Sequence, residues 1–214
     1  MSSTLRVCEI FRSIQGESTR AGVVCIFVRL SGCNLNCSYC DTVYAGKEFS
    51  IMTVSEVVDR VATFSGDTVE ITGGEPLLQS ATPELAERLV AEGKTVLVET
   101  NGSIDIGVLP AGCVKIVDVK CPSSGMCGSF LEDNIGRLES GDEVKFVIGS
   151  AADLDWAGSF VRNASLCDRC TVLFSPVASS VAPADVAQWI LEYDLPVRLQ
   201  VQLHKIIWGD RRGV

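Results

Sequence analysis

Three cysteines in one short segment have the spacing of iron–sulfur ligands. Cys33, Cys37 and Cys40 form a C-x3-C-x2-C run between Gly32 and Asp41. Closely spaced cysteine thiolates hold iron–sulfur clusters. Because a [4Fe–4S] cluster has one iron more than this run has cysteines, one iron stays open to a ligand that binds through nitrogen and oxygen. The segment therefore predicts a cluster with a free coordination site.

Zinc is the alternative for this segment. A structural zinc site has a closed set of four ligands, and no histidine stands near the loop. A fourth cysteine could come from elsewhere in the chain, so the spacing alone leaves zinc open.

The chain has ten cysteines, and the other seven carry weaker signals. Cys8 and Cys25 stand among apolar residues and are expected in the core, where unpaired cysteine often packs. Four more stand in a second C-x2-C and in a Gly/Ser-rich stretch; they are Cys167, Cys170, Cys121 and Cys127. These four thiols could make a second metal site, but we favour thiols without a functional role or an adventitious disulfide.

The composition is that of a folded, acidic protein. Of the 214 residues 47% are hydrophobic, the mean hydropathy is +0.28 and the formal net charge is −9. Such a charge does not neutralise phosphates, so we expect no nucleic-acid partner; a small substrate or a basic electron donor fits better. No apolar run reaches the roughly 18 residues needed to span a bilayer, and the N-terminus lacks a signal-peptide pattern. We therefore expect a cytoplasmic protein that does not bind membranes.

Strands and helices alternate along the chain. The expected strands are Val23–Leu30, Thr68–Thr72, Thr95–Thr100, Val114–Val119, Glu143–Ile148, Thr171–Phe174 and Val197–Leu203. The expected amphipathic helices are Thr53–Phe64, Pro83–Glu92, Ala151–Val161 and Pro183–Tyr193. Alternation predicts an α/β fold with a parallel sheet and crossover helices.

The length and the loops limit the architecture. A complete eight-stranded barrel usually needs about 250 residues, and two stretches, from Thr100 to Lys120 and from there to Glu143, have little room for a helix. We expect one domain over residues 1–214 with an incomplete parallel β/α barrel of about six strands, in which loops replace some helices. The segments Ser31–Thr42 and Gly73–Pro76 follow the first two strands, where such sheets carry their chemistry.

Two motifs resemble the radical S-adenosylmethionine (SAM) superfamily. The cysteine run has an aromatic residue, Tyr39, before its last cysteine, as in that superfamily's signature. Thr72-Gly73-Gly74-Glu75-Pro76 resembles the superfamily's GGEP motif, which lines the SAM amino group. The resemblance implies that SAM occupies the open iron and that its reductive cleavage gives a 5′-deoxyadenosyl radical, which abstracts hydrogen from the substrate.

Further segments narrow the resemblance to one family. Ile10–Glu17 reads Ile-Phe-Arg-Ser-Ile-Gln-Gly-Glu before the first expected strand, Asp41-Thr42 follows the last cluster cysteine, and His204-Lys205 follows the last expected strand. Together with the final Arg-Gly-Val, these resemble the 7-carboxy-7-deazaguanine synthases. The resemblance implies a lyase of purine metabolism, in queuosine and 7-deazapurine biosynthesis, a pathway that leads to tRNA modification.

That family converts 6-carboxy-5,6,7,8-tetrahydropterin to 7-carboxy-7-deazaguanine and ammonia with a [4Fe–4S] cluster, SAM and Mg²⁺. The resemblance further implies a flavodoxin as electron donor and a homodimer.

The resemblance also implies roles for individual residues, none of them a catalytic acid or base. Cys33, Cys37 and Cys40 would hold the cluster, and the Thr42 hydroxyl would bind Mg²⁺. The substrate contacts would be Ile14, Gln15, Gly16, Glu17, Arg29, Thr72, His204 and the carboxylate of Val214. The SAM contacts would be Tyr39, Cys40, Asp41, Gly74, Asp118, Val119, Lys120, Ser175, Pro176, Val177 and Ala178.

Two other functions remain open at this point. A glycyl-radical activating enzyme is also a short radical SAM protein, but it acts on a protein and has no use for Gln15-Gly16-Glu17 or for Thr42. A non-enzymatic iron–sulfur or zinc module would have thiol ligands without SAM cleavage.

Overall fold

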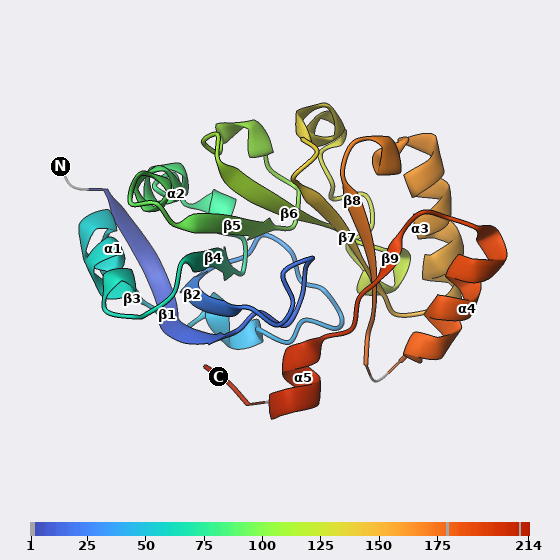
Figure 1. Ribbon diagram of the computed structural model, residues 1–214, viewed down its shortest axis with the longest axis horizontal. Helices are drawn as coiled ribbons and strands as arrows, with labels where there is room; N and C mark the ends of the chain where they lie inside the picture. The colour runs from blue at the N-terminus through green and yellow to red at the C-terminus, as the bar shows by residue number, and fades with distance from the viewer. Residues whose placement is uncertain (1–2, 179, 210) are drawn as a thin grey trace.

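The computed structural model describes residues 3–178, 180–209 and 211–214 (Figure 1). Within these ranges the strands form one open sheet in the order β3-β1-β2-β4-β5-β6-β7-β8-β9. The parallel part consists of β2 (Val24–Leu30), β4 (Thr68–Gly73), β5 (Thr95–Thr100), β6 (Cys113–Val119), β7 (Glu143–Ile148), β8 (Thr171–Pro176) and β9 (Arg198–Leu199). The sheet does not close, so the expectation of an incomplete barrel is confirmed.

Four helices cover the convex side of this sheet (Figure 1). They are α1 (Val54–Ala62), α2 (Thr82–Ala91), α3 (Ala151–Asn163) and α4 (Pro183–Tyr193). Apolar side chains at helical spacing, such as Val57 and Val61 of α1, enter the core against the strands. Short 3-10 turns replace helices after β5 and after β6, as expected from the loops there. Among the described residues no helix is long and apolar enough to cross a membrane.

The N-terminal edge of the sheet was not expected. Strand β1 (Thr4–Ile14) runs antiparallel to β2, and β3 (Ser50–Thr53) pairs with its outer side. The motif segment Ile10–Glu17 therefore does not precede the first strand but completes β1 and turns into β2. Polar residues interrupt β1 because it is an edge-side strand that is only partly buried, and its apolar alternation is therefore weak.

The prediction of a last strand over Val197–Leu203 was wrong in its second half. Only Arg198 and Leu199 pair with β8, and α5 begins at Leu203 and ends at Trp208. The Leu203 amide donates to the Gly16 carbonyl at 2.9 Å instead of continuing a strand ladder. The chain thereby leaves the sheet and places His204 in a helix beside the β1–β2 turn.

The concave face of the parallel strands is charged. Glu70, Glu99, Asp118 and Lys145 stand in the interiors of four adjacent strands and line a single cavity. Their neighbours in sequence point the other way into the apolar core, because successive side chains of a strand alternate between its faces. The sheet therefore has an apolar face, which the helices cover, and a polar face, which lines the cavity.

Candidate active site

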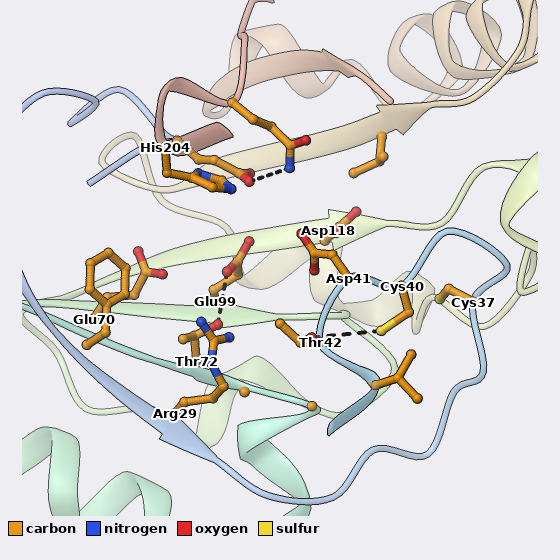
Figure 2. A pocket seen from close by; sticks show the side chains of 18 of the residues that line it. Arg29, Cys37, Cys40, Asp41, Thr42, Glu70, Thr72, Glu99, Asp118 and His204 are labelled. Atoms are coloured by element: carbon orange, nitrogen blue, oxygen red, sulfur yellow. Dashed lines mark hydrogen bonds between the residues drawn. The ribbon is translucent and has the colours of Figure 1, made fainter. Parts of the chain in front are cut away.

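The concave face encloses a cavity of about 570 Å³. That volume falls in the range of small-molecule sites, roughly 300–1,000 Å³. Its walls come from the ends of the parallel strands, the cysteine segment, the turn after β1 and the C-terminal residues. Figure 2 shows Arg29 and Thr72 on one side of this space and His204 on the opposite side.

The three cysteines of the motif line one wall of this cavity. Cys33, Cys37 and Cys40 are all free thiols, and Cys33 and Cys40 are exposed. The Leu35 amide donates to Cys33 Sγ at 3.4 Å. Burial raises the pKa of the Cys37 thiol, and the nearby Lys120 ammonium opposes that rise. Backbone donors and a neighbouring cation are the environment that thiolate ligands of a cluster need.

The arrangement does not favour a mononuclear zinc site. Within the described ranges, no group of three or more His, Cys, Asp or Glu side chains lies close enough to hold a single metal ion. Thiolates that each bind a different iron of a cluster stand further apart than the ligands of one ion. The same result gives no support to a second metal site at Cys121, Cys127, Cys167 and Cys170; Cys121 and Cys170 are buried.

The Gly73–Pro76 segment packs directly on the cysteine segment. A Cβ on Gly74 would lie 2.2 Å from the Gly32 carbonyl oxygen, and one on Gly73, whose φ is +153°, would lie 2.1 Å from that of Leu30. The Glu75 amide donates to the Gly32 carbonyl at 2.8 Å. Only glycines permit this approach, so they fix the cysteine segment against the end of β4.

The Glu75 carboxylate ties this segment to the next strand. Its Oε1 accepts from the Leu77 amide at 2.9 Å and from Thr100 Oγ1 at 2.8 Å, and its Oε2 accepts from the Asn101 amide at 2.7 Å. Burial raises the pKa of Glu75, although these donors favour the charged form. Three donors on one buried carboxylate hold the ends of β4 and β5 together.

The turn between β1 and β2 carries the expected substrate segment. Ile14, Gln15, Gly16 and Glu17 all line the cavity. His204 packs on Gly16 so closely that a Cβ there would lie 2.2 Å from the His204 Nδ1. The structure thus brings this turn and the only histidine together, although they are far apart in sequence.

Arg29 and Thr72 enter the cavity from β2 and β4. The Arg29 Nε donates to Glu9 Oε1 at 2.8 Å, and Thr72 Oγ1 donates to Glu99 Oε2 at 3.0 Å (Figure 2). Burial lowers the pKa of Arg29, but Tyr44 and Glu9 outweigh it and the pKa is raised. The guanidinium therefore stays charged where it faces the cavity.

The structure separates the remaining expected residues into two groups. Those that line the cavity are Tyr39, Asp41, Thr42, Asp118, Lys120, Val177 and Val214. Those outside the described lining are Val119, Ser175 and Pro176, which are buried, and Ala178, which is exposed. The Thr42 hydroxyl lies 3.8 Å from Cys40 Sγ (Figure 2).

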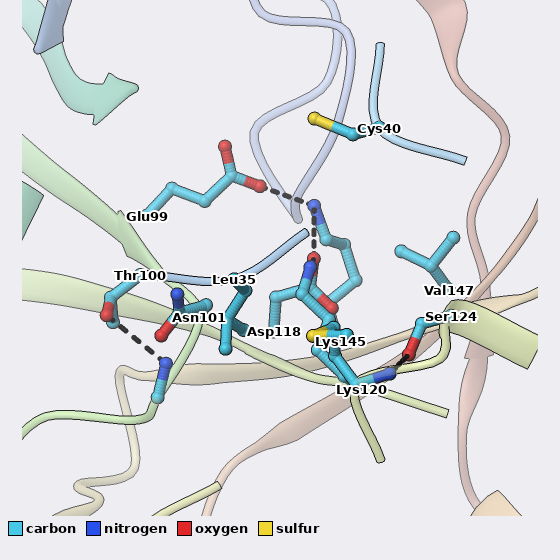
Figure 3. A network of polar contacts seen from close by, with 12 residues as sticks. Leu35, Cys40, Glu99, Thr100, Asn101, Asp118, Lys120, Ser124, Lys145 and Val147 are labelled. Carbon is cyan, nitrogen blue, oxygen red and sulfur yellow. Dashed lines mark hydrogen bonds and ion pairs between the residues drawn. The ribbon is translucent and has the colours of Figure 1, made fainter. Parts of the chain in front are cut away.

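Sequence reasoning missed a buried ammonium in the wall of the cavity, that of Lys145. Lys145 Nζ pairs with Glu17 Oε2 at 2.8 Å and with Glu99, and it lies 3.9 Å from Asp118 Oδ2 (Figure 3). Burial alone would raise the pKa of Glu17, but Lys145 lowers it to about 2. The signal was present in the sequence as charged residues inside strands that are otherwise mostly apolar, such as Lys145 between Val144 and Phe146.

Two acids of the lining, Glu70 and Glu99, were also missed by sequence reasoning. Glu70 is the more deeply buried of them. Its side chain is buried beside Gln15, whose Nε2 donates to its Oε2. Burial, and then repulsion by Glu99, raise the pKa of Glu70 well above its ordinary value of 4.5. The same cavity thus shifts the pKa values of two carboxyls in opposite directions, lowering that of Glu17 and raising that of Glu70.

Comparisons with known proteins agree with this geometry. The radical SAM superfamily model matches residues 27–111. The 7-carboxy-7-deazaguanine synthase of Koribacter versatilis is 45% identical and covers 98% of this chain and 100% of its own length; that of Chlorobaculum tepidum is 43% identical and covers 98% and 97%. The chain belongs to the 7-carboxy-7-deazaguanine synthase family. The crystal structure of QueE from Escherichia coli shares its fold, with a TM-score of 0.80 at 21% identity over 94% of this chain and 95% of that one.

Membership of the 7-carboxy-7-deazaguanine synthase family decides between the functions left open by the sequence. The relatives that carry this name match along nearly the whole of this chain and nearly the whole of their own length. The protein is an enzyme of the radical SAM superfamily, and that superfamily uses a [4Fe–4S] cluster and SAM.

Glu75→Gln tests the link between β4 and β5. The amide keeps the size of the side chain but turns one acceptor into a donor that faces N–H or O–H groups. We expect a loss of about 1–3 kcal/mol in the free energy of unfolding, measured by urea denaturation. Glu87→Gln, at an exposed position of α2, is the matched control; an equal effect of both would contradict the assigned role.

Glu70→Gln and Glu17→Gln test the raised pKa of Glu70 and the lowered pKa of Glu17. The raised pKa of Glu70 means that its stabilising effect is complete below pH 4.5 and is lost as the pH rises. Glu70→Gln should therefore raise the thermal midpoint relative to wild type near pH 8 but not near pH 4. The pKa of Glu17 is lowered to about 2, so its stabilising effect is present above pH 4.5 and is lost as the pH falls towards 2.

Glu17→Gln should accordingly lower the midpoint at neutral pH. Thermal unfolding from pH 4 to 8 measures both variants, and shifts of the same sign at pH 8 would show that the protonation states are misassigned.

Proposed function

We propose that the protein converts 6-carboxy-5,6,7,8-tetrahydropterin to 7-carboxy-7-deazaguanine and ammonia. The observation that carries the proposal is the meeting of three free thiols, the Gly73–Gly74 strand end and the Gln15–Glu17 turn in one cavity of about 570 Å³. The reaction is balanced without a net oxidant, because product and ammonia together contain the atoms of the substrate. A single domain over residues 1–214 suffices for this activity.

The cluster side of the cavity fits the cofactors of the superfamily. Cys33, Cys37 and Cys40 would hold the [4Fe–4S] cluster by their thiolates. When bound, the cluster and SAM supply an electron and a group that abstracts hydrogen. We restrict the proposed SAM contacts to residues that line the cavity: Tyr39, Cys40, Asp41, Gly74, Asp118, Lys120 and Val177. Lys120 Nζ holds Asp118 Oδ2 at 2.7 Å and so fixes this acid for a polar ligand.

The opposite side of the cavity fits a pterin. Its ring presents amide and amine N–H groups, for which the charged Glu17 and the Gln15 amide are suitable partners. Arg29 Nε is held by Glu9, which leaves its terminal nitrogens for the substrate carboxylate. Ile14, Gly16, Thr72, His204 and Val214 complete the proposed pocket.

Mg²⁺ and the protein partners are parts of the same proposal. The Thr42 hydroxyl, next to the cluster segment, would give Mg²⁺ one oxygen ligand, and the substrate carboxylate another. We further propose a flavodoxin as electron donor, a homodimer and a cytoplasmic location.

Incubation with substrate tests the activity. The anaerobically reconstituted protein, with SAM, dithionite, Mg²⁺ and 6-carboxytetrahydropterin, should form 7-carboxy-7-deazaguanine, detected by mass spectrometry. Cys37→Ala should lose the absorbance of the cluster. Its rate of 5′-deoxyadenosine formation should fall at least 100-fold, which corresponds to a barrier higher by about 2.7 kcal/mol, because the radical step lacks its electron source. Cys127→Ala, an exposed cysteine outside the cavity lining, should keep both. Formation of 5′-deoxyadenosine without the deazapurine would refute the substrate.

Thr42→Ala tests the magnesium site separately. Loss of one hydroxyl ligand should leave the cluster spectrum unchanged and weaken the activation of turnover by Mg²⁺ by roughly 10- to 100-fold, the range for lost support of a metal site. A titration of turnover against Mg²⁺ measures this, with Thr63→Ala in the exposed end of α1 as control. An unchanged titration would remove Thr42 from the site.

A further inference from the structure

A bulge in β1 turns one acidic side chain into the cavity side. Val7 pairs with Leu30 but Glu9 pairs with Arg29, so two steps along β1 correspond to one step along β2. Leu30 is in the core and Arg29 lines the cavity, so their partners also point to opposite faces. Without the bulge, Glu9 would share the core face of Val7. The extra residue, Cys8, is what allows the strand to carry a carboxylate beside Arg29.

This carboxylate is shared by three separate segments. Glu9 Oε1 accepts from Arg29 Nε at 2.8 Å and from Tyr44 Oη at 2.9 Å, and Glu9 Oε2 lies 3.5 Å from Arg212 Nε. Arg29 belongs to β2, Tyr44 to the 3-10 turn after the cysteine segment and Arg212 to the C-terminal residues. Burial, the Glu9 hydrogen bond and the charge of Glu9 raise the pKa of Tyr44 to about 12 against the opposing effect of Arg29. The phenol therefore remains a donor to Glu9.

Arg212 makes further contacts around Glu9. Its guanidinium lies over the Tyr44 ring at 3.7 Å from the centroid, and its Nη2 pairs with Glu48 Oε2 at 2.8 Å. A planar cation stacked on an aromatic ring and paired with two carboxylates is a geometry that lysine cannot reproduce. Exposed ion pairs add little to fold stability. The contacts of Arg212 are therefore better explained by a role at the neighbouring cavity.

The residues before Arg212 are held at the other side of the cavity. We define the C-terminal strap as residues 200–209 and 211–214. Its start is held by Gln202 Nε2, which donates to Glu17 Oε1 at 2.8 Å, and by the Leu203 amide on the Gly16 carbonyl. Its middle is held by Lys205, 3.3 Å from Asp41 Oδ2. Figure 1 shows α5 and the C-terminal end beside β1 and β2, so the strap crosses from one side of the site to the other.

We propose that Glu9, Tyr44 and Arg212 are positioning residues that fasten the C-terminal strap over the cavity and, through the one Glu9 carboxylate, orient Arg29. Closure of the strap and orientation of Arg29 then depend on each other. The strap brings His204 and Val214 to the cavity, and Arg29 is proposed to bind the substrate carboxylate. Loss of the Glu9–Tyr44–Arg212 contact should therefore weaken substrate binding and leave the cluster unchanged. The role of these residues towards the pterin rests on the proposed function.

Arg212→Ala is the direct test. Hydrogen exchange of residues 200–214 in the reconstituted enzyme, without substrate, should become at least 10-fold faster, because the end of the strap is released. With substrate, KM should rise roughly 10- to 100-fold, as expected for lost substrate positioning, with a smaller change in kcat. The ratio of 5′-deoxyadenosine to deazapurine should also rise, since radical formation continues beside a misplaced substrate.

Two further variants separate the parts of the contact. Tyr44→Phe keeps the ring under Arg212 but removes the donor to Glu9, so KM should rise while exchange in the strap stays near that of wild type. Arg212→Lys keeps the positive charge but loses the planar group that stacks on Tyr44 and pairs with two carboxylates. It should recover less than half of the protection against hydrogen exchange that Arg212→Ala loses. Arg198→Ala, an exposed arginine of β9 outside the cavity lining, is the control and should match wild type.

The outcomes are distinguishable from a failure of the proposed function. If wild type forms no deazapurine, the substrate is wrong, and the exchange comparison still decides whether Arg212 fastens the strap. Wild-type exchange and KM in Arg212→Ala would overturn the proposal. If Arg212→Ala does not fold, Glu48→Gln removes only the Arg212–Glu48 ion pair. The hydrogen-exchange rate of the strap should then lie between those of wild type and a released strap, and a wild-type rate would also overturn the proposal.

Discussion

The buried ammonium of Lys145 is the charge around which the acidic wall of the cavity is arranged. Glu17 and Glu99 pair with it directly, and Asp118 lies within 4 Å. Without this cation the partly buried carboxylates of Glu17 and Glu99 would lose their charged partner, which is unfavourable, whereas Asp118 would keep Lys120. The pKa of Glu70, which accepts from the Gln15 amide and is repelled by Glu99, is raised instead. One lysine in β7 thus permits a polar cavity inside an otherwise apolar sheet.

Ion pairs hold the side chains near the Gln15–Glu17 turn in place. Near the cysteine segment, close packing of the backbone does the same. Gly73 and Gly74 bring the end of β4 against the cysteine segment at distances that leave no room for a Cβ. Glu75 then joins that strand end to Asn101, whose Nδ2 lies 3.9 Å from Cys33 Sγ. The thiols are therefore positioned from two strands, and the segment that carries them needs little regular structure of its own.

The sequence predicted the parallel strands well because each has a buried apolar centre, as at Val96, Leu97 and Val98 of β5. It failed where burial is partial. Strand β1 carries the exposed Arg6 and Arg12 and only two fully buried residues. The residues after Leu199 follow side-chain contacts of Gln202 and not a ladder. The cysteine and glycine motifs located the site, and Glu17 and Asp118 were expected there, but Glu70, Glu99 and Lys145 were missed. A charge within an apolar strand can be assigned to the cavity only once the two faces of the sheet are known.

The joining of both ends of the chain at one cavity has a consequence for biosynthesis. The thiols and the glycine motif lie within the first part of the chain, whereas His204 and Arg212 lie near its C-terminal end. During translation, N-terminal segments emerge and begin to fold first. The region that holds the cysteines therefore leaves the ribosome well before the strap that completes the cavity. A nascent chain passes through a stage in which this wall is open to solvent and accessible to whatever delivers iron and sulfide.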